Sequence, residues 1–169
     1  MCQRIIQLVV MIVKVLVAYD TYTGTTEKCA KILAEKFKEA RIINLAKGYG
    51  VVLNEYDCVV VGSYVHAGKI SKRVKKFCEK NIENLRGKKI GIFLCMLGEE
   101  KDFEEYVSRN FSSQFLDLVK AKDYFGGELN YERMNFVFRF ILKLIVKNTK
   151  PKLGVREEKI ENFAKQLMD

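Results

Sequence analysis

Short apolar runs of strand length alternate with helical segments along most of this chain. The apolar runs occupy residues 12–18, 41–45, 58–61, 90–97 and 121–129. The helical segments between them occupy residues 26–38, 71–81 and 102–118. Strands that are apolar on both faces belong in the middle of a parallel sheet covered by helices. The alternation therefore predicts an α/β fold: a doubly wound, five-stranded parallel sheet with helices on both faces.

The length of 169 residues and the lack of repeats or linker-like stretches predict one domain. We assign residues 11–169 to this domain and residues 1–10 to an N-terminal extension or a lead-in to the first strand. The opening apolar run is interrupted by Gln7 and Lys14 and ends at Asp20. It is too short for a membrane span, which needs about 20 apolar residues, so we interpret it as a strand.

The cysteines indicate the redox environment of the protein, and the net charge indicates the class of partner. Five cysteines with no Cys-x-x-Cys pair support neither a disulfide framework nor a metal site, and they fit a reducing cytoplasm. Cys58 and Cys95 lie inside apolar runs, where a thiol usually acts as a small core residue. The formal charge of +9 favours an anionic partner, such as a membrane surface or an acidic ligand. No nucleic-acid-binding signature accompanies it, and nothing in the sequence indicates an oligomeric state.

The stretch "VLVAYDTYTGTTEKCA" (residues 15–30) leads from the first apolar run through a cluster of hydroxyls into a helix. The start of a helix presents unpaired N–H groups and partial positive charge, which attract an anion. Threonines surround Gly24 at positions where their hydroxyls can add donors, so we expect a phosphate here. The loop lacks the lysine and the glycines of the nucleotide-binding motifs. The alternative is that these threonines only cap a helix, for which a single threonine would suffice.

The pattern Thr-x-Thr-Gly-x-Thr at residues 21–26 resembles the phosphate loop of the flavodoxin family, which binds flavin mononucleotide (FMN). The resemblance implies a flavodoxin-like fold with FMN as its cofactor. It also implies that the phosphate is held by Thr21, Tyr22, Thr23, Gly24, Thr25 and Thr26. A response-regulator receiver would share the fold, but it needs an aspartate where this chain has Gly62 and Ser63.

The segments "YDCVVVGSYVHAGKISKRVKKF" and "IGIFLCMLGEE" resemble the two strands and exit loops that flank the flavin ring in this family. The resemblance implies that the ring is framed by Ser63, Tyr64, Val65, His66, Ala67, Gly68, Cys95, Met96, Leu97 and Gly98. Glycines at 62 and 68 would let backbone amides approach the ring. The chain has no tryptophan, so Tyr64 is the expected stacking residue in these two loops.

Two groups of residues near these loops have alternative interpretations. His66 is either a solvent-exposed loop residue or a contact to flavin or substrate, because loop residues at strand ends often carry function. The cations Lys69, Lys72 and Arg73 form either a solvated start of a helix or an attraction for an anionic substrate.

The segment "ERMNFVFRFILKLIVKNTKPK" places Asn135, Arg139, Lys143 and Lys147 four residues apart on one stripe of a helix. The remaining positions of residues 134–147 are all apolar. The helix is therefore either buried in the core, or it lies at a membrane interface or against a large apolar ligand with its basic stripe facing headgroups. Its short apolar run excludes spanning.

This helix, the preceding "FGGELNY" and the segment "VVVGSYVHAGKISKRVKKF" are together similar to the menaquinone-dependent protoporphyrinogen oxidases, a flavodoxin-like branch. The resemblance implies an FMN enzyme that passes hydrogen equivalents from a tetrapyrrole to a membrane quinone. Arg139, Lys143 and Lys147 would meet lipid headgroups or propionates. The resemblance places the protein in the cytoplasm, with a peripheral position on the inner face of the cell membrane as a further expectation. No side chain can be named as an obligatory acid or base.

Two other functions stay open. A soluble flavodoxin that carries electrons would have the same fold and cofactor, although such carriers are usually acidic and this chain is basic. A binding module that has kept the fold and lost the flavin is the third possibility.

Overall fold

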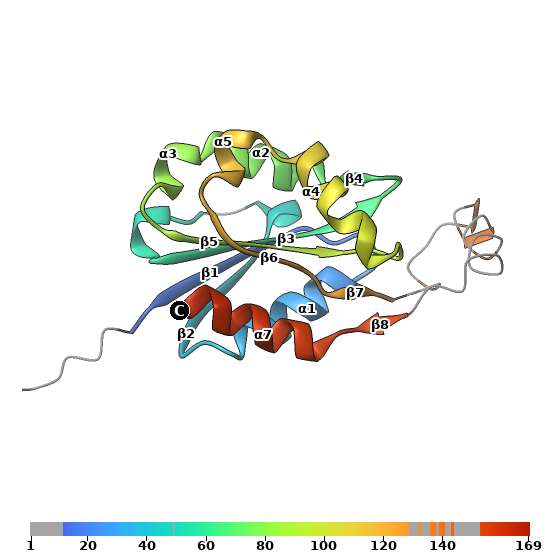
Figure 1. Ribbon diagram of the computed structural model, residues 1–169, viewed down its shortest axis with the longest axis horizontal. Helices are drawn as coiled ribbons and strands as arrows, with labels where there is room; N and C mark the ends of the chain where they lie inside the picture. The colour runs from blue at the N-terminus through green and yellow to red at the C-terminus, as the bar shows by residue number, and fades with distance from the viewer. Residues whose placement is uncertain are drawn as a thin grey trace, which may run out of the picture.

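The computed structural model describes residues 12–48, 50–128, 132, 136–137, 139–140, 143 and 153–169. Its centre is a parallel sheet in the order β2-β1-β3-β5-β6 (Figure 1). The strands are β1 (Lys14–Tyr19), β2 (Glu39–Asn44), β3 (Cys58–His66), β5 (Lys89–Cys95) and β6 (Val119–Tyr124). The predicted doubly wound fold is confirmed, and its direction of winding reverses between β1 and β3, where ligands of such folds bind.

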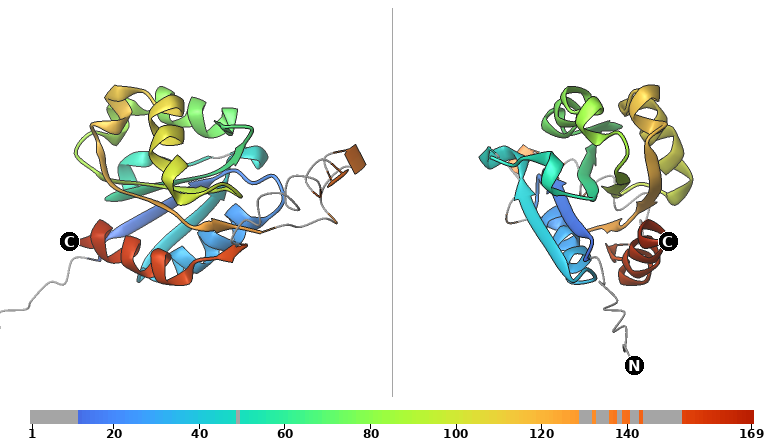
Figure 2. Two further views of the ribbon diagram at one scale, coloured as in Figure 1. Left: turned by 45° about the vertical axis from the view of Figure 1, so that its right-hand side comes forward. Right: turned by 90° about the vertical axis from the view of Figure 1, so that its left-hand side faces the viewer.

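Helices cover both faces of the sheet (Figures 1 and 2). One face carries α2 (Lys72–Lys80), α3 (Ile82–Leu85), α4 (Phe103–Asn110) and α5 (Ser113–Leu116). The other carries α1 (Thr25–Ala34) and α7 (Glu157–Met168). Short 3-10 helices occupy Leu45–Lys47, Leu53–Glu55 and Glu100–Asp102.

A hydrophobic core lies on each face of the sheet, and alternate residues of each central strand pack into one core or the other. The central strands are therefore continuous apolar runs in the sequence. In β1, Leu16 and Ala18 pack under α2 and α4, whereas Val15 and Val17 pack against α1 and α7. All four side chains are fully buried. This two-sided burial fixes the register of β1, because a slip by one residue would exchange its two faces.

Strand β3 is longer than the predicted 58–61. It runs past the sheet and turns at Ala67 and Gly68, both with positive φ, into β4 (Lys69–Ile70). In this hairpin Val65 pairs with Ile70 and His66 pairs with Lys69. The hairpin carries the side chains of the β3 end beyond the sheet edge, where the candidate site lies.

Two other elements differ from expectation. The predicted helix 102–118 is broken where Phe111 becomes extended, and Ser112 then caps α5 by accepting a hydrogen bond from the Phe115 N–H. The predicted strand 121–129 divides into β6 and β7 (Gly126–Gly127), and β7 pairs with β8 (Gly154–Val155).

The predicted extension and late helix fall largely outside the described residues, including Asn135 and Lys147. Arg139 is half-buried and Lys143 is exposed. Within the described part of the chain, no helix is long and apolar enough to cross a membrane.

Candidate functional site

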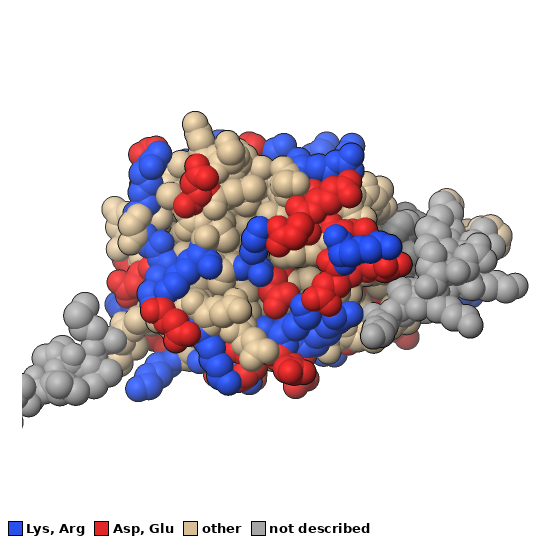
Figure 3. Space-filling model, in the orientation of Figure 1, with Lys and Arg blue, Asp and Glu red and all other residues tan. Residues whose placement is uncertain are grey.

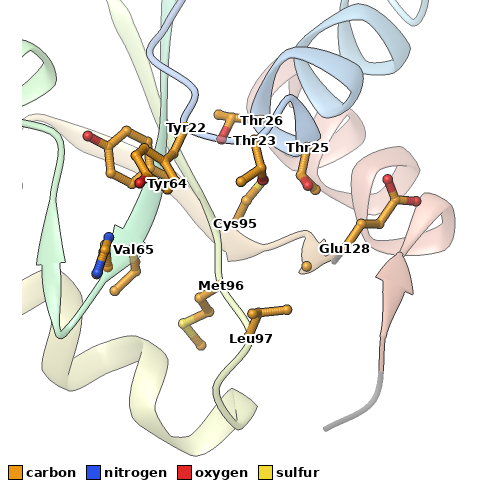
Figure 4. Close-up of a pocket in the computed structure, with 12 residues that line it drawn as sticks. Tyr22, Thr23, Thr25, Thr26, Tyr64, Val65, Cys95, Met96, Leu97 and Glu128 are labelled. Atoms are coloured by element: carbon orange, nitrogen blue, oxygen red, sulfur yellow. The ribbon is translucent and has the colours of Figure 1, made fainter. Parts of the chain in front are cut away.

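A cleft opens at the carboxyl ends of β1, β3 and β5, and its volume is about 470 Å³ including the solvent at its mouth. Figure 4 shows the threonines of the first loop on one side of it and Tyr22 and Tyr64 on another, with Met96 and Leu97 below. The lining residues are Tyr22, Thr23, Thr25, Thr26, Tyr64, Val65, His66, Cys95, Met96, Leu97, Gly127 and Glu128. The structure thus brings together the three loops that sequence reasoning selected.

The hydroxyl loop is shaped to leave the start of α1 open. Gly24 precedes the helix with a φ of 102°, and no side chain caps the helix at this position. Thr21 closes the turn, because its Oγ1 accepts the Gly24 N–H at 2.9 Å. A helix start without a side-chain cap keeps backbone donors available to an anion.

The Thr26 hydroxyl, at the edge of this loop, is buried without a good hydrogen-bond partner in the described part of the chain. The residue is 1% exposed, and its Oγ1 has no hydrogen-bond partner of ordinary geometry among the described residues. It lies near the Cys95 thiol, which is a weak partner. A buried hydroxyl without a good partner costs free energy, so its presence beside a cleft indicates a partner that is supplied from outside.

Aromatic rings form one wall of the cleft. The rings of Tyr22 and Tyr64 lie 5.8 Å apart at 45°, and those of Tyr22 and His66 lie 5.6 Å apart at 65°. Burial raises the pKa of Tyr64, and the charge of Asp20 raises it further, so its phenol stays protonated at neutral pH. Tyr64, the expected stacking residue, lines the cleft, and Tyr22 adds a second ring from the hydroxyl loop.

The floor of the cleft is fixed by backbone contacts that sequence reasoning missed. The Met96 N–H donates to the Gly126 carbonyl at 3.0 Å. A Cβ on Gly127 would lie 2.3 Å from the Met96 oxygen, so only glycine allows this approach. The paired glycines of "FGG" were the signal available in the sequence for Gly127. Nothing comparable marked Glu128, which forms an ion pair with Lys28 at 2.7 Å.

Two buried thiols remain protonated, Cys95 beside the cleft and Cys58 at the opposite end of the sheet. Burial raises the pKa of Cys95 well above its usual value, the neighbouring Cys29 raises it further, and Thr26 opposes the shift. Burial likewise raises the pKa of Cys58 to about 12. Both residues are buried, as predicted for core cysteines. Among the described residues no cluster of three His, Cys, Asp or Glu could hold a metal ion.

Six predicted site residues are not among those that line the cleft: Thr21, Gly24, Ser63, Ala67, Gly68 and Gly98. Ser63 is fully buried, and its hydroxyl donates to the Tyr64 carbonyl at 2.9 Å and accepts the Ser71 N–H at 3.0 Å. Ala67 and Gly68 form the hairpin turn. Gly62, expected to let amides approach a ring, instead makes room for the Phe93 ring, which a Cβ would meet at 2.1 Å.

The sequence is similar to proteins of known families. A family model described as Flavodoxin domain matches residues 16–153. Protoporphyrinogen IX dehydrogenase (quinone) of Escherichia coli strain K12 is 24% identical over 170 residues, which cover 91% of this chain and 94% of that protein.

Two solved structures have similar folds. A flavodoxin of Streptococcus pneumonia TIGR4 has a TM-score of 0.61 at 18% identity, and the match covers 91% of this chain and 97% of that one. The rubredoxin oxygen:oxidoreductase of Desulfovibrio gigas has a TM-score of 0.56 at 16% identity; 92% of this chain matches, but only 36% of that protein. At these identities the structures support the fold alone.

Proposed function

Because this chain belongs to the flavodoxin domain family, whose cofactor is FMN, we propose that it is an oxidoreductase that takes hydrogen equivalents from a tetrapyrrole and passes them to a quinone. The observation that carries the proposal is the buried Thr26 hydroxyl, which lacks a good partner at the edge of a cleft formed by three strand ends. The similarity to an E. coli enzyme named for protoporphyrinogen IX and quinone supports the choice of substrates.

The residues present fit FMN. The cleft is lined by hydrophobic and aromatic side chains with a few hydroxyl groups, which is the lining typical of small-molecule sites. Thr23, Thr25 and Thr26, with the open start of α1, would hold the phosphate. Tyr22 and Tyr64 offer ring faces for the flavin, and Met96 and Leu97 offer an apolar surface. When bound, FMN supplies the redox chemistry, namely the acceptance and release of hydrogen equivalents.

The chain's own contribution is binding and orientation. Asp20 ties the hydroxyl loop to the hairpin, because its carboxylate accepts the Thr21 N–H at 2.9 Å and the Ser71 hydroxyl at 2.5 Å. The phenol of Tyr64, protonated at neutral pH, can donate a hydrogen bond. These contacts fix the walls of the cleft before a ligand enters, which lowers the entropy cost of binding.

An anaerobic assay with protoporphyrinogen IX and a menaquinone analogue tests the proposal. We expect the FMN-loaded protein to form protoporphyrin and quinol in a one-to-three ratio, since six hydrogen atoms are removed in three two-electron steps. Porphyrin absorbance and quinone absorbance report the two products. Protein that holds FMN, forms no porphyrin and yet passes electrons between a reductase and a redox partner would replace this proposal with the electron carrier.

We also propose that the protein touches a membrane where its quinone resides. Three apolar side chains of the late segment are strongly exposed: Phe136 at 83%, Val137 at 66% and Phe140 at 61%. Lys143 is exposed close by in the sequence and could meet anionic headgroups. Amphipathic segments of this composition bind at the bilayer interface.

Replacing Phe136 and Phe140 with serine should weaken binding to phosphatidylglycerol/phosphatidylethanolamine vesicles at least 10-fold, because burying one phenyl ring contributes about 1.5–3 kcal/mol. Flotation of the FMN-loaded protein measures the bound fraction. Val52, which is 60% exposed and distant in the sequence, provides the matched control as Val52→Ser. Equal flotation of the double variant and the control would contradict membrane contact through these rings.

A further inference from the structure

A second hollow lies against the other side of the aromatic wall. Its volume is about 1040 Å³ including the solvent at its mouth, and it is formed by β4, the start of α2 and the aromatic wall. Tyr22, Tyr64 and His66 line both this groove and the FMN cleft. A molecule that sits in the groove therefore contacts the same rings that border the FMN cleft.

The groove is strongly basic. Its lining includes Lys69, Lys72, Arg73 and Lys76, and no Asp or Glu is among its described lining residues. Basic side chains also gather along the edge where Figure 1 places α2 and β4, whereas acidic and basic side chains mix over α7 and β6 (Figure 3). On the face seen in Figure 3, the basic side chains are therefore not spread evenly.

Several lysines of the chain are paired with carboxylates, whereas, among the described residues, the lysines of the groove are not. Lys75 on the same helix lies 4.0 Å from Glu79, and Lys28, Lys31 and Lys36 also have carboxylate partners. Lys69, Lys72 and Lys76 have no carboxylate within 4 Å in the part of the chain that the structure describes. Lys72 and Lys76 are also one helical turn apart, a spacing at which like charges repel. Binding of an anion would relieve this repulsion.

Arg73 is held in place by the buried Asp20 carboxylate. Its guanidinium lies 3.2 Å from the Asp20 carboxylate, whose side chain is 2% exposed. Ser71 accepts the Arg73 N–H at 3.1 Å and caps α2. The base of the groove is therefore organised by buried hydrogen bonds, and the three lysines remain as its free positive charge.

We propose that this groove binds the carboxylates of an organic substrate whose flat, apolar body lies against Tyr22 and Tyr64. The inference rests on the proposed function and deepens it. The groove would hold the acidic side chains of the substrate that is oxidised in the adjoining FMN cleft. The hollow shape favours a small ligand over a bilayer, whose surface would bridge across it. Two or more carboxylates match the three lysines.

The test uses FMN-loaded protein and two probes, protoporphyrin IX and naphthalene-2,6-dicarboxylate, each compared with its dimethyl ester in the same dilute detergent. The variant Lys69→Gln/Lys72→Gln/Lys76→Gln should weaken binding of both acids about 10- to 30-fold, as expected for three modest charge contacts. Binding of the esters should be unchanged. Acid binding to the wild type should weaken as salt is raised. FMN binding should stay the same, since these lysines do not line the cleft.

A matched control removes three exposed lysines elsewhere, as Lys38→Gln/Lys47→Gln/Lys80→Gln. Equal affinity of the two triple variants for both acids would overturn the inference, as would esters that bind as tightly as acids. Loss of anionic-vesicle binding in the groove variant, with acid binding intact, would assign the lysines to a membrane instead. A wild type that binds the acids through these lysines but forms no porphyrin would refute the proposed function and leave the groove assignment standing.

Discussion

Replacing Thr26 with valine is expected to weaken FMN binding by about 10- to 150-fold while leaving riboflavin binding unchanged. Valine keeps the shape of threonine and removes the hydroxyl. A hydrogen bond to a charged group contributes about 1.5–3 kcal/mol, and this hydroxyl is buried beside the cleft without a good partner. Riboflavin lacks the phosphate, so the difference between the two ligands isolates this contact. Quenching of flavin fluorescence during titration measures both affinities.

The same substitution is expected to raise the free energy of unfolding of the protein without FMN by about 1 kcal/mol. The valine removes the cost of a buried hydroxyl that lacks a good partner. Urea denaturation followed by circular dichroism measures this change. Thr26→Ser is the matched control, because it retains the hydroxyl and should retain most of the FMN affinity. Equal weakening of FMN and riboflavin, or a serine variant that behaves like the valine variant, would remove Thr26 from the phosphate site.

Replacing Gly127 with alanine is expected to lower the free energy of unfolding by about 2–4 kcal/mol and to weaken FMN binding at least 10-fold. The new Cβ would lie 2.3 Å from the Met96 oxygen and 2.7 Å from its carbonyl carbon. Both are backbone atoms, so no side-chain rotation can relieve the clash, and the floor of the cleft must move. Urea denaturation and FMN titration measure the two effects.

Gly50→Ala provides the control, because a Cβ there meets nothing within 4 Å and the backbone φ is ordinary. Its stability should stay within about 0.5 kcal/mol of the wild type. If Gly127→Ala matched this control in both measurements, the close approach of β7 to the exit of β5 would not shape the cleft.

The fold could be predicted from the sequence because its central strands are buried on both faces. Such strands read as short continuous runs of valine, isoleucine and leucine, and β1 and β5 lie within two residues of their predicted bounds. The ends of less regular elements were harder to predict. Phe111 continues the apolar helical pattern, so the sequence predicts one unbroken helix here. In the folded chain the Ser112 hydroxyl instead accepts the Phe115 N–H and starts a new helix. The extension of β3 depends on pairing with β4, which is a tertiary contact.

The cleft was predictable where it follows directly from a strand end. The hydroxyl loop and the residues after β5 are adjacent in sequence to buried strands, so their place at one edge of the sheet follows from the parallel topology. Gly127 and Glu128 reach the cleft only because β7 packs on the Met96 backbone. For the basic groove, the sequence indicated the cations Lys69, Lys72 and Arg73 but not the groove itself. Its concave shape depends on the hairpin that separates it from the cleft.

The hairpin of β3 and β4 places Tyr64 and His66 on the walls of both hollows. A ligand that moved either ring from one hollow would therefore also change the shape of the other hollow. Linkage requires the effect to be mutual: whatever factor FMN adds to the affinity for a carboxylate ligand, that ligand returns to FMN. Cofactor retention would then rise and fall with substrate supply.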